Sequence, residues 1–274
     1  MPVDVSALVL SNTPLSPGYN VLALEAPEIG AITSPGQFVM VKPSPGQDPM
    51  LRRPFSVFEI LRGDRGDVRG ISILNKRVGV GTALLYAARP GDVIATLGPL
   101  GKPFVPVDPP EDAWMVAGGV GLAPFSTLAE TLAARGTKMT LFYGGRSAAD
   151  IYYEPYFAQL GATLVLTTED GTRGEAGRVT APLARALAGF SGELTIYTCG
   201  PTPMMRAVAQ LGDAASRPVF VSLEPIMGCG MGGCYSCVVR VKRPTGGSHF
   251  VRSCLEGPVF NAAGVVWDAL PSHG

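Results

Sequence analysis

The sequence predicts three consecutive units: an antiparallel β-barrel, a doubly wound parallel α/β domain and a small C-terminal module rich in cysteine. Three observations support this prediction. Short β-branched and aromatic runs fill the N-terminal part, strands alternate with helices after Pro109-Pro110, and four of the five cysteines lie between Cys229 and Cys254. The expected boundaries are 1–108, 109–223 and 224–274.

Six strands are expected in the barrel, because runs of strand-forming residues are separated there by turn signals such as Ser16-Pro17-Gly18 and Ser34-Pro35-Gly36. The expected strands are 5–10, 19–24, 37–42, 54–60, 68–74 and 93–97, with a short helix at 82–88. Strands at this spacing are typical of an antiparallel barrel or sandwich.

The second unit alternates strands at 113–117, 139–143, 163–167, 193–198 and 218–223 with helices at 122–134, 152–160, 180–188 and 203–211. This alternation predicts a parallel, doubly wound sheet. Two more strand-like runs, 238–242 and 249–253, follow in the tail.

The charge balance excludes some classes of function. Lys plus Arg and Asp plus Glu both number 22 among the 274 residues, so no basic excess is present to bind nucleic acid. No apolar run reaches the ~18 residues of a membrane span, and Met1–Asn12 lacks the basic start of a signal peptide. We therefore expect a cytoplasmic protein. Its low charged fraction of 16% suggests that a partner covers part of the surface.

The tail carries the strongest chemical motif. Cys229, Cys234 and Cys237 follow C-x4-C-x2-C spacing, and sixteen residues separate Cys237 from Cys254. This is the plant-type ferredoxin spacing for a [2Fe–2S] cluster, and the interspersed glycines let the backbone wrap closely around it. The alternative is a zinc site, which more often begins with a C-x2-C pair and lacks such a glycine-rich wrap.

Two turns of the second unit are candidate nucleotide sites. Gly118–Pro124 lies between a strand and a helix, where amide groups can receive a pyrophosphate, although Pro124 stands where a dinucleotide fingerprint has its third glycine. A plain tight turn is the alternative. Cys199-Gly200-Pro201 follows a later strand at the same ligand-binding edge. Arg146 and Ser147, after the second strand, suit an adenosine 2′-phosphate or simply face solvent.

The barrel offers weaker signals. Arg53-Pro54-Phe55-Ser56 places a cation, an aromatic ring and a hydroxyl along one extended segment, and Gly79–Thr82 precedes a short helix. The alternatives are a core position for Phe55 and a plain capped turn. We read His249 and His273 as surface residues and Cys199 as a buried small residue. The sequence supports no hydrolytic chemistry and no catalytic side chain.

The order of these motifs resembles the ferredoxin reductase superfamily. More closely, the chain resembles the electron-transfer, iron–sulfur flavoprotein subunit of the NAD-dependent, two-flavin dihydroorotate dehydrogenases. The resemblance covers nearly the whole chain. The matching segments are 51–56, 78–82, 199–201, 222–224 leading to Cys229, and 254–260.

The resemblance implies FAD, a [2Fe–2S] cluster and NAD(H) as the redox groups. The residues implied for FAD are Arg53, Pro54, Phe55, Ser56, Leu74, Asn75, Lys76, Gly81 and Thr82. Those implied for NAD are Gly119, Val120, Gly121, Pro124, Thr168, Asp170, Gly171, Cys199, Gly200 and Pro201, with the last six near the nicotinamide. The implied cluster ligands are Cys229, Cys234, Cys237 and Cys254. Asn75-Lys76 departs from the Tyr-Arg that this family often has, and Phe55 replaces an aliphatic residue.

The resemblance also implies a catalytic FMN subunit that oxidises dihydroorotate to orotate in pyrimidine biosynthesis, in a heterotetramer of two plus two subunits. Electrons then pass through the cluster and FAD to NAD⁺. The small subunit of a sulfhydrogenase, glutamate synthase or ferredoxin-NADP transhydrogenase is an open alternative. A non-redox nucleotide-binding module held by zinc is another. We expect NAD rather than NADP, although no carboxylate stands at the usual distance to accept the ribose hydroxyls.

Overall fold

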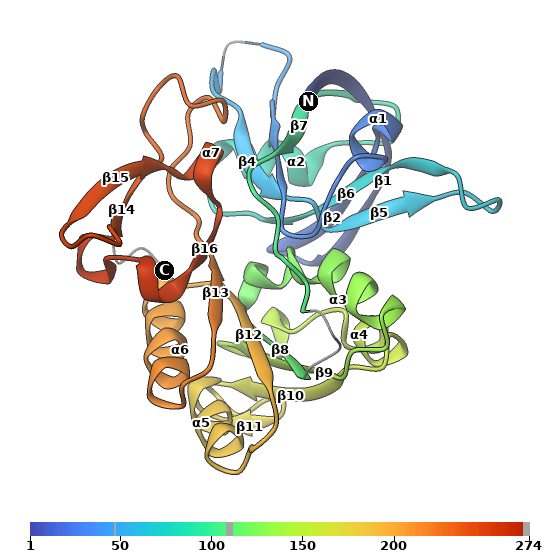
Figure 1. Cartoon of the computed structure of the whole chain (residues 1–274). Helices are drawn as coiled ribbons and strands as arrows, with labels where there is room; N and C mark the ends of the chain where they lie inside the picture. Colours follow the sequence, from blue (N-terminus) through green and yellow to red (C-terminus); the bar gives the residue numbers. More distant parts are fainter. Residues whose placement is uncertain (47, 108–111, 271–274) are drawn as a thin grey trace.

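The structure, a computed structural model, describes residues 1–46, 48–107 and 112–270 (Figure 1). The expected domain boundary at 108/109, the Pro109-Pro110 pair and His273 lie outside these residues. The strands of the described part form two seven-stranded sheets and a two-stranded hairpin. In Figure 1 the first sheet lies at the upper right, the second below it, and the C-terminal hairpin at the left.

The first sheet is antiparallel throughout and runs in the order β4-β3-β7-β1-β2-β6-β5. Its strands are β1 (Val3–Ser16), β2 (Tyr19–Glu25), β3 (Phe38–Val41), β4 (Arg53–Ser56), β5 (Glu59–Arg62), β6 (Val68–Lys76) and β7 (Val93–Leu100). Two helices accompany it, α1 (Pro27–Gly30) and α2 (Val80–Ala87). Its core includes Leu22, Leu24, Val39 and Ile71, all fully buried.

The expectation of six strands was wrong by one, because the segment expected at 54–60 divides into β4 and β5. At the division, Val57 donates its amide to Gln37, just before β3, whereas Phe58 donates its amide to Ser72 on β6. The chain thus crosses here from one edge of the sheet to the other and brings the edges together. Pro54 lies on the edge strand β4, where a missing amide donor costs no ladder bond.

The second sheet runs in the order β11-β10-β9-β8-β12-β13-β16. Its strands are β8 (Asp112–Gly118), β9 (Met139–Gly145), β10 (Thr163–Thr168), β11 (Glu175–Ala176), β12 (Leu194–Cys199), β13 (Val219–Ser222) and β16 (Val259–Asn261). All neighbours are parallel except β13 and β16. The five long strands confirm the expected parallel sheet; the two short edge strands, β11 and β16, were not expected.

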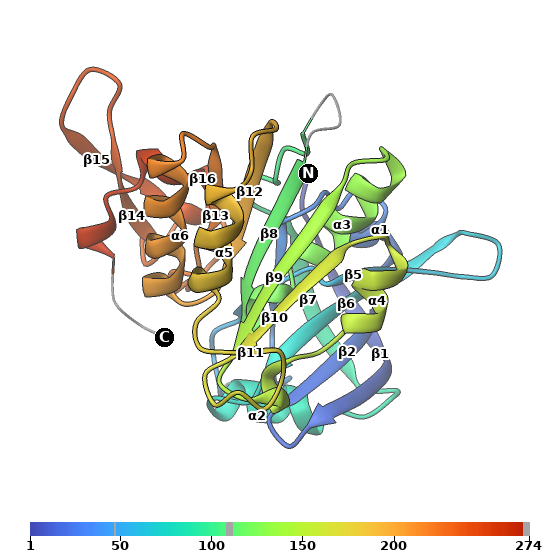
Figure 2. The ribbon, with the colours of Figure 1, turned by 90° about the horizontal axis from the view of Figure 1, so that it is seen from below.

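Four helices cover the two faces of this sheet, as a doubly wound fold requires (Figure 2). α3 (Phe125–Ala134) and α4 (Glu154–Gln159) pack on one face, and α5 (Thr180–Ala188) and α6 (Thr202–Ala214) on the other. α3 begins later than expected, after a 3-10 turn over Gly119–Leu122. α4 begins at Glu154 because Tyr153 before it is left-handed, with φ of 59°.

The C-terminal module is a loop, a hairpin and a return to the second sheet. The hairpin pairs β14 (Val238–Lys242) with β15 (Ser248–Arg252), and α7 (Ser253–Glu256) follows it. β16 then joins the second sheet beside β13. His249, expected at the surface, is half-buried on β15, and its Nδ1 is buried. Through β16, the C-terminal module is therefore part of the second sheet.

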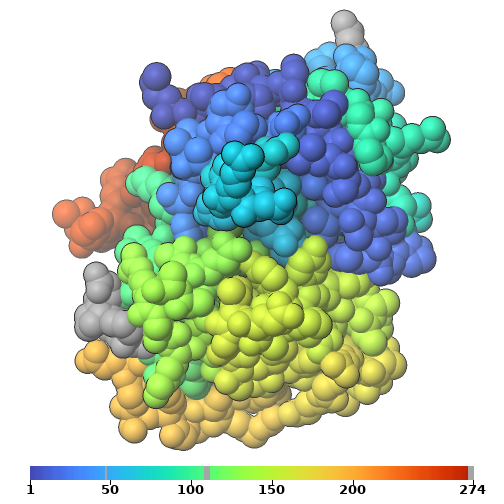
Figure 3. Space-filling model, turned by 90° about the vertical axis from the view of Figure 1, so that its right-hand side faces the viewer, coloured from blue at the N-terminus to red at the C-terminus, as the bar shows by residue number. Residues whose placement is uncertain are grey.

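The barrel and the α/β domain meet along a continuous seam, which the space-filling view shows from the side (Figure 3). An apolar cluster fills it, with Phe58 and Leu74 from the barrel against Ala123 and Tyr153 from the α/β domain. The rings of Phe58 and Tyr153 meet edge to face at a centroid distance of 4.6 Å. This seam holds the candidate flavin and nucleotide segments against each other.

Candidate cofactor and nucleotide sites

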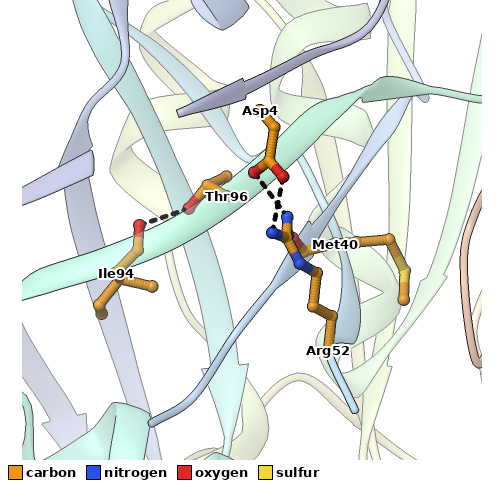
Figure 4. Close-up of polar contacts among 5 residues, drawn as sticks. All are labelled: Asp4, Met40, Arg52, Ile94 and Thr96. Carbon is orange, nitrogen blue, oxygen red and sulfur yellow. Dashed lines mark hydrogen bonds and ion pairs between the residues drawn. The ribbon is translucent and has the colours of Figure 1, made fainter. Parts of the chain in front are cut away.

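Two consecutive arginines precede the Pro-Phe-Ser segment, and the structure gives them different surroundings. Arg52 forms a bidentate ion pair with Asp4 on β1, with N–O distances of 2.9 and 2.8 Å (Figure 4). Arg53 donates from Nη1 to the carbonyls of Leu51 and Arg52. Among the described residues, Nε and Nη2 of Arg53 have no hydrogen-bond acceptor, so of the two guanidinium groups that of Arg53 is the one available to bind a ligand.

Arg53 lies beside the first turn of α2. A Cβ atom on Gly81 would lie 3.5 Å from Nε of Arg53 and 3.2 Å from Pro43, so the two elements approach closely. Thr82 organises the turn: its Oγ1 accepts the amides of Val78 and Gly79 and donates to the carbonyl of Gly79. The Arg53 guanidinium and the first turn of α2 thus lie side by side, an arrangement suited to binding a phosphate group.

The other residues expected near FAD divide into two groups. Pro54, Phe55 and Ser56 are half-buried on β4, and Phe55 packs against the barrel core, as the alternative reading expected. Leu74 and Asn75 are buried on β6, and Asn75 donates to the carbonyl of Thr82 at 3.0 Å. The Lys76 ammonium lies 5.2 Å from the centroid of the Tyr19 ring, at the domain seam.

The two glycine turns of the α/β domain pack directly on each other. A Cβ atom on Gly121 would lie 2.3 Å from the carbonyl oxygen of Cys199, and one on Gly200 would lie 3.0 Å from backbone atoms of Gly118. Gly119 and Gly200 have φ of 55° and 143°, which side chains disfavour. Close packing thus requires Gly121 and Gly200, and the backbone conformation favours glycine at position 119. The two turns form one continuous floor with Pro124 at the start of α3.

The segment Thr168–Gly171 lies at the same edge of the sheet, but on the other side of this floor. β9 and β8 separate β10 from β12, which places the Thr168 and Cys199 ends roughly 14 Å apart at ordinary strand spacing. The structure therefore does not bring together the two segments expected near the nicotinamide. Thr168 is buried and donates to the carbonyl of Arg173, whereas hydrogen bonds from Thr172 lower the pKa of Asp170.

Three carboxylates near the expected ribose position have partners. Asp150 accepts the hydroxyl of Tyr19 at 2.7 Å and the amide of Arg146 at 3.2 Å. Glu154 pairs with Arg173, with an N–O distance of 2.6 Å. Asp170 accepts the amide and hydroxyl of Thr172. The side chain of Arg146 is exposed in the same loop.

Sequence reasoning did not select Glu224 as a site residue. The thiol of Cys199 donates to Oε1 of Glu224 at 3.6 Å. Burial raises the pKa of the Cys199 thiol well above its usual range, and the neighbouring Glu224 raises it further. Glu224 is exposed to solvent, yet the protein atoms packed around its carboxyl raise the pKa of that group too. A protonated thiol and a carboxyl thus stand beside the glycine floor.

The residues joining the two domains also escaped sequence analysis. Besides its bond to Asp150, Tyr19 on β2 stacks at a tilt on Tyr152, with centroids 4.9 Å apart. The Tyr152 hydroxyl lies 2.9 Å from Oγ of Ser16. Burial, and then the hydrogen bond to Asp150, raise the pKa of Tyr19, which keeps its phenol a proton donor. These contacts fix the loop after β9 to the barrel.

The four tail cysteines approach each other in two pairs. Hydrogen bonding, first to Ser236 and then to Cys229, lowers the pKa of the Cys234 thiol to about 6. Burial, followed by the adjacent Cys237 thiol, raises the pKa of Cys254 to about 12. No three described His, Cys, Asp or Glu side chains converge on one ion position. Two thiol pairs suit a cluster of two irons.

Two of the glycines between these cysteines leave no space for a side chain. Gly230, with φ of 73°, would place a Cβ atom 2.5 Å from Met40, and Gly232, with φ of 81°, one 2.5 Å from Leu255. Arg252 fastens the loop by donating to the carbonyl of Gly232 at 3.0 Å. The loop is therefore packed closely on the barrel and on α7, and the donor set fits an iron–sulfur cluster.

A buried apolar cluster connects the cysteines with the flavin-type segment. Cys237 and Cys254 pack in it with Phe38 and Met40 of β3. In the barrel sheet Phe38 is the partner of Ser56, and Met40 is the partner of Pro54. Bonded or packed atoms thus lead without a break from two of the thiols to β4.

These features define a class of protein: a flavin- and nucleotide-type reductase fold with an iron–sulfur module inserted after its last parallel strand. Family models agree with both halves of this description. Residues 115–210 match the oxidoreductase NAD-binding domain, and residues 224–266 match the iron–sulfur cluster binding domain of dihydroorotate dehydrogenase B. No helix in the described part of the chain combines the length and hydropathy of a membrane span.

Curated relatives identify the family. The chain is 40% identical over 247 residues to the electron transfer subunit of dihydroorotate dehydrogenase B (NAD⁺) from Geobacillus kaustophilus strain HTA426, covering 89% of this chain and 91% of the relative. It is 36% identical over 263 residues to the same subunit of Desulforamulus reducens, covering 96% and 98%. The chain belongs to the family of electron transfer subunits of NAD⁺-dependent dihydroorotate dehydrogenase B.

Solved structures agree on the fold. A structure titled as an NADH-dependent reduced ferredoxin-NADP oxidoreductase in flavin-based electron bifurcation matches with a TM-score of 0.82 and 25% identity, over 96% of this chain and 91% of that one. A ferredoxin reductase of carbazole 1,9a-dioxygenase matches with a TM-score of 0.70 at 21% identity, over 80% and 69%.

Proposed function

We propose that this chain passes electrons between a catalytic FMN subunit, which oxidises dihydroorotate to orotate, and NAD⁺. The observation that carries the proposal is the buried contact of Cys237 and Cys254 with β3, whose residues pair with the flavin-type segment on β4. Bound FAD supplies two-electron exchange with NAD(H) and one-electron exchange with a [2Fe–2S] cluster. The protein must then hold, orient and insulate these groups.

For FAD, the chain provides a cation and a helix turn. Arg53 and the amides around Gly81 and Thr82 receive the pyrophosphate, because they converge from β4 and α2. Phe55 and Ser56 border the ring system from β4, and Lys76 lies at the seam where the ring meets the nucleotide domain.

For NAD(H), the Gly119–Gly121 turn and the Cys199–Pro201 turn form the floor on which the dinucleotide lies. Cys199 and Glu224 stand at the nicotinamide end, where the raised pKa values of the thiol and the carboxyl disfavour a negative charge beside a transferred hydride. Thr168, Asp170 and Gly171 serve the opposite, adenosine end, since two strands separate them from Cys199.

For the cluster, Cys229, Cys234, Cys237 and Cys254 are the ligands. Cys237 and Cys254 are buried towards the barrel, whereas Cys234 is exposed. The same loop exposes the apolar side chains of Ile226, Met231 and Tyr235. The catalytic subunit docks there, because an apolar rim around an exposed ligand gives it both binding area and a short path to the cluster.

The assembly contains two catalytic and two electron-transfer subunits and works in the cytoplasm, in keeping with five unpaired cysteines. The three units span 1–108, 109–223 and 224–274, with β16 returning from the third unit to the sheet of the second.

The test combines the purified chain with a dihydroorotate-oxidising FMN subunit and follows NAD⁺ reduction at 340 nm. We expect orotate and NADH in equal amounts, FAD and iron in the chain in a ratio of one to two, and no zinc. A chain that binds zinc in place of iron, or a pair of subunits that oxidises dihydroorotate without forming NADH, contradicts the proposal.

A further inference from the structure

Three asparagines on neighbouring barrel strands form a chain of side-chain amides. Nδ2 of Asn75 on β6 donates to Oδ1 of Asn20 on β2, and Nδ2 of Asn20 donates to Oδ1 of Asn12 on β1, both at 2.7 Å. Asn20 and Asn75 are fully buried. A buried amide costs folding free energy unless it is hydrogen-bonded, so this chain requires an explanation beyond barrel stability.

Both ends of the amide chain hold the backbone of α2. Asn75 donates to the carbonyl of Thr82 in the first turn at 3.0 Å. Asn12 donates to the carbonyls of Tyr86 and Ala88 at 2.9 and 2.8 Å, which are end groups that the helix itself leaves without donors. A carbonyl can accept a hydrogen bond only from an N–H group, so the side chains of Asn12 and Asn75 must turn Nδ2 towards α2. The bonds to Asn20 then fix which way its own amide group is turned.

α2 needs such external support. It has eight residues, its first turn contains the weak helix formers Val80, Gly81 and Thr82, and only Gly81 and Leu85 are buried. Helices this short are unstable on their own. Its position relative to the barrel therefore depends strongly on the amides that hold its two ends.

We propose that the Asn12–Asn20–Asn75 chain is a positioning device that sets the first turn of α2 against Arg53 for the FAD pyrophosphate. This inference rests on the proposed role of Gly81 and Thr82 and extends it to residues behind the site. Asn75 acts here through Thr82, and its buried Oδ1 has no partner among the described residues. Asn20 bonds to the other two amides, so its influence on FAD must pass through them.

The test is Asn20→Leu, which keeps the side-chain volume and removes both amide bonds. The full chain is stripped of FAD in concentrated bromide, and the dissociation constants of FAD and riboflavin are measured by flavin fluorescence. We expect FAD to bind about tenfold more weakly, because its pyrophosphate loses a correctly placed turn. Riboflavin has the same ring but no phosphate, so its affinity stays within twofold of the wild-type value.

Thr33→Val is the matched control. It removes a 2.8 Å side-chain bond to the carbonyl of Ile29 at α1, the other helix of the barrel. This variant loses stability but keeps both flavin affinities. If Asn20→Leu does not fold, Asn12→Ala replaces it; Asn12 is only half-buried and holds the far end of α2. Asn12→Ala is then expected to weaken FAD binding selectively by a similar factor.

The outcomes separate this inference from the proposed flavin site. If Arg53→Ala weakens FAD binding while the asparagine variants do not, the site is correct and the positioning role is wrong. If Arg53→Ala has no effect either, the site itself is misplaced. Equal losses of FAD and riboflavin affinity in Asn20→Leu mean general damage to the barrel and also overturn the positioning role.

Discussion

The two adjacent arginines before β4 allow a sharp test of the flavin site. Arg53→Ala removes the guanidinium beside Gly81, whereas Arg52→Ala removes the guanidinium bound to Asp4. The substitutions delete the same atoms at neighbouring positions. Only the first is expected to affect FAD.

The magnitude follows from the donors that Arg53 has available. Nη1 is engaged by the carbonyls of Leu51 and Arg52, which leaves Nε and Nη2 for one two-pronged contact with a phosphate. A hydrogen bond to a charged group is worth about 1.5–3 kcal/mol. At about 1.4 kcal/mol per tenfold change, the dissociation constant of FAD rises roughly 10- to 150-fold.

The control has a different expected loss. The Arg52–Asp4 pair is partly exposed, with 23% and 55% of the two side chains accessible, and such pairs contribute about 0–1 kcal/mol to stability. Arg52→Ala therefore lowers the melting temperature slightly and leaves FAD affinity unchanged.

The assay is fluorescence titration of the FAD-free chain, with Arg53→Lys as a third variant. Lysine keeps the charge but not the planar fork, so it recovers only part of the affinity. If Arg53→Ala binds FAD as tightly as the wild type, or if Arg52→Ala loses as much affinity, the assignment of Arg53 to the pyrophosphate is refuted.

Three further predictions concern the other sites. Cys234→Ser lowers bound iron and stops transfer to the catalytic subunit while NADH still reduces FAD; full iron content in this variant contradicts the ligand assignment. Glu224→Gln raises the melting temperature at pH 8 but not at pH 4. The raised pKa of Glu224 means that folding favours its protonated form, so the wild-type protein loses stability as the pH rises. If the melting temperatures of the variant and the wild type differ equally at both pH values, this argument is refuted. NADH has a higher kcat/KM than NADPH; a tenfold preference for NADPH that disappears in Arg146→Ala reverses the choice of nucleotide.

Local patterns in the sequence were sufficient for most of the fold. β-branched runs between turn signals located the barrel strands, and alternation with helices predicted the parallel sheet. The C-x4-C-x2-C spacing selected four cysteines that the structure arranges as two neighbouring pairs, and three of them lie in one short loop and cannot separate far. Edge strands β11 and β16 escaped because two and three residues carry no periodicity.

Long-range polar contacts were beyond such reasoning. Tyr19 and Asp150 are 131 residues apart, and nothing local in the sequence distinguishes this tyrosine from a core residue. Asn75 is 55 residues from Asn20, and single asparagines on strands usually indicate turns or edges rather than a buried amide chain. The position of Glu224, just after a strand at the ligand-binding edge, could have marked it as a site residue. Its role becomes apparent only from its contact with Cys199, which the sequence does not show.

The way the tail is attached explains why one chain contains all three sites. The loop from residue 224 to 237 packs on β3 of the barrel through Met227 and Cys237, and β16 then pairs with β13 of the nucleotide domain. The barrel and the α/β domain also meet directly at Tyr19 and Asp150. Each unit therefore contacts both of the others, and a shift of one must break contacts with two. The barrel, the α/β domain and the C-terminal module are therefore fixed relative to one another by contacts at three interfaces.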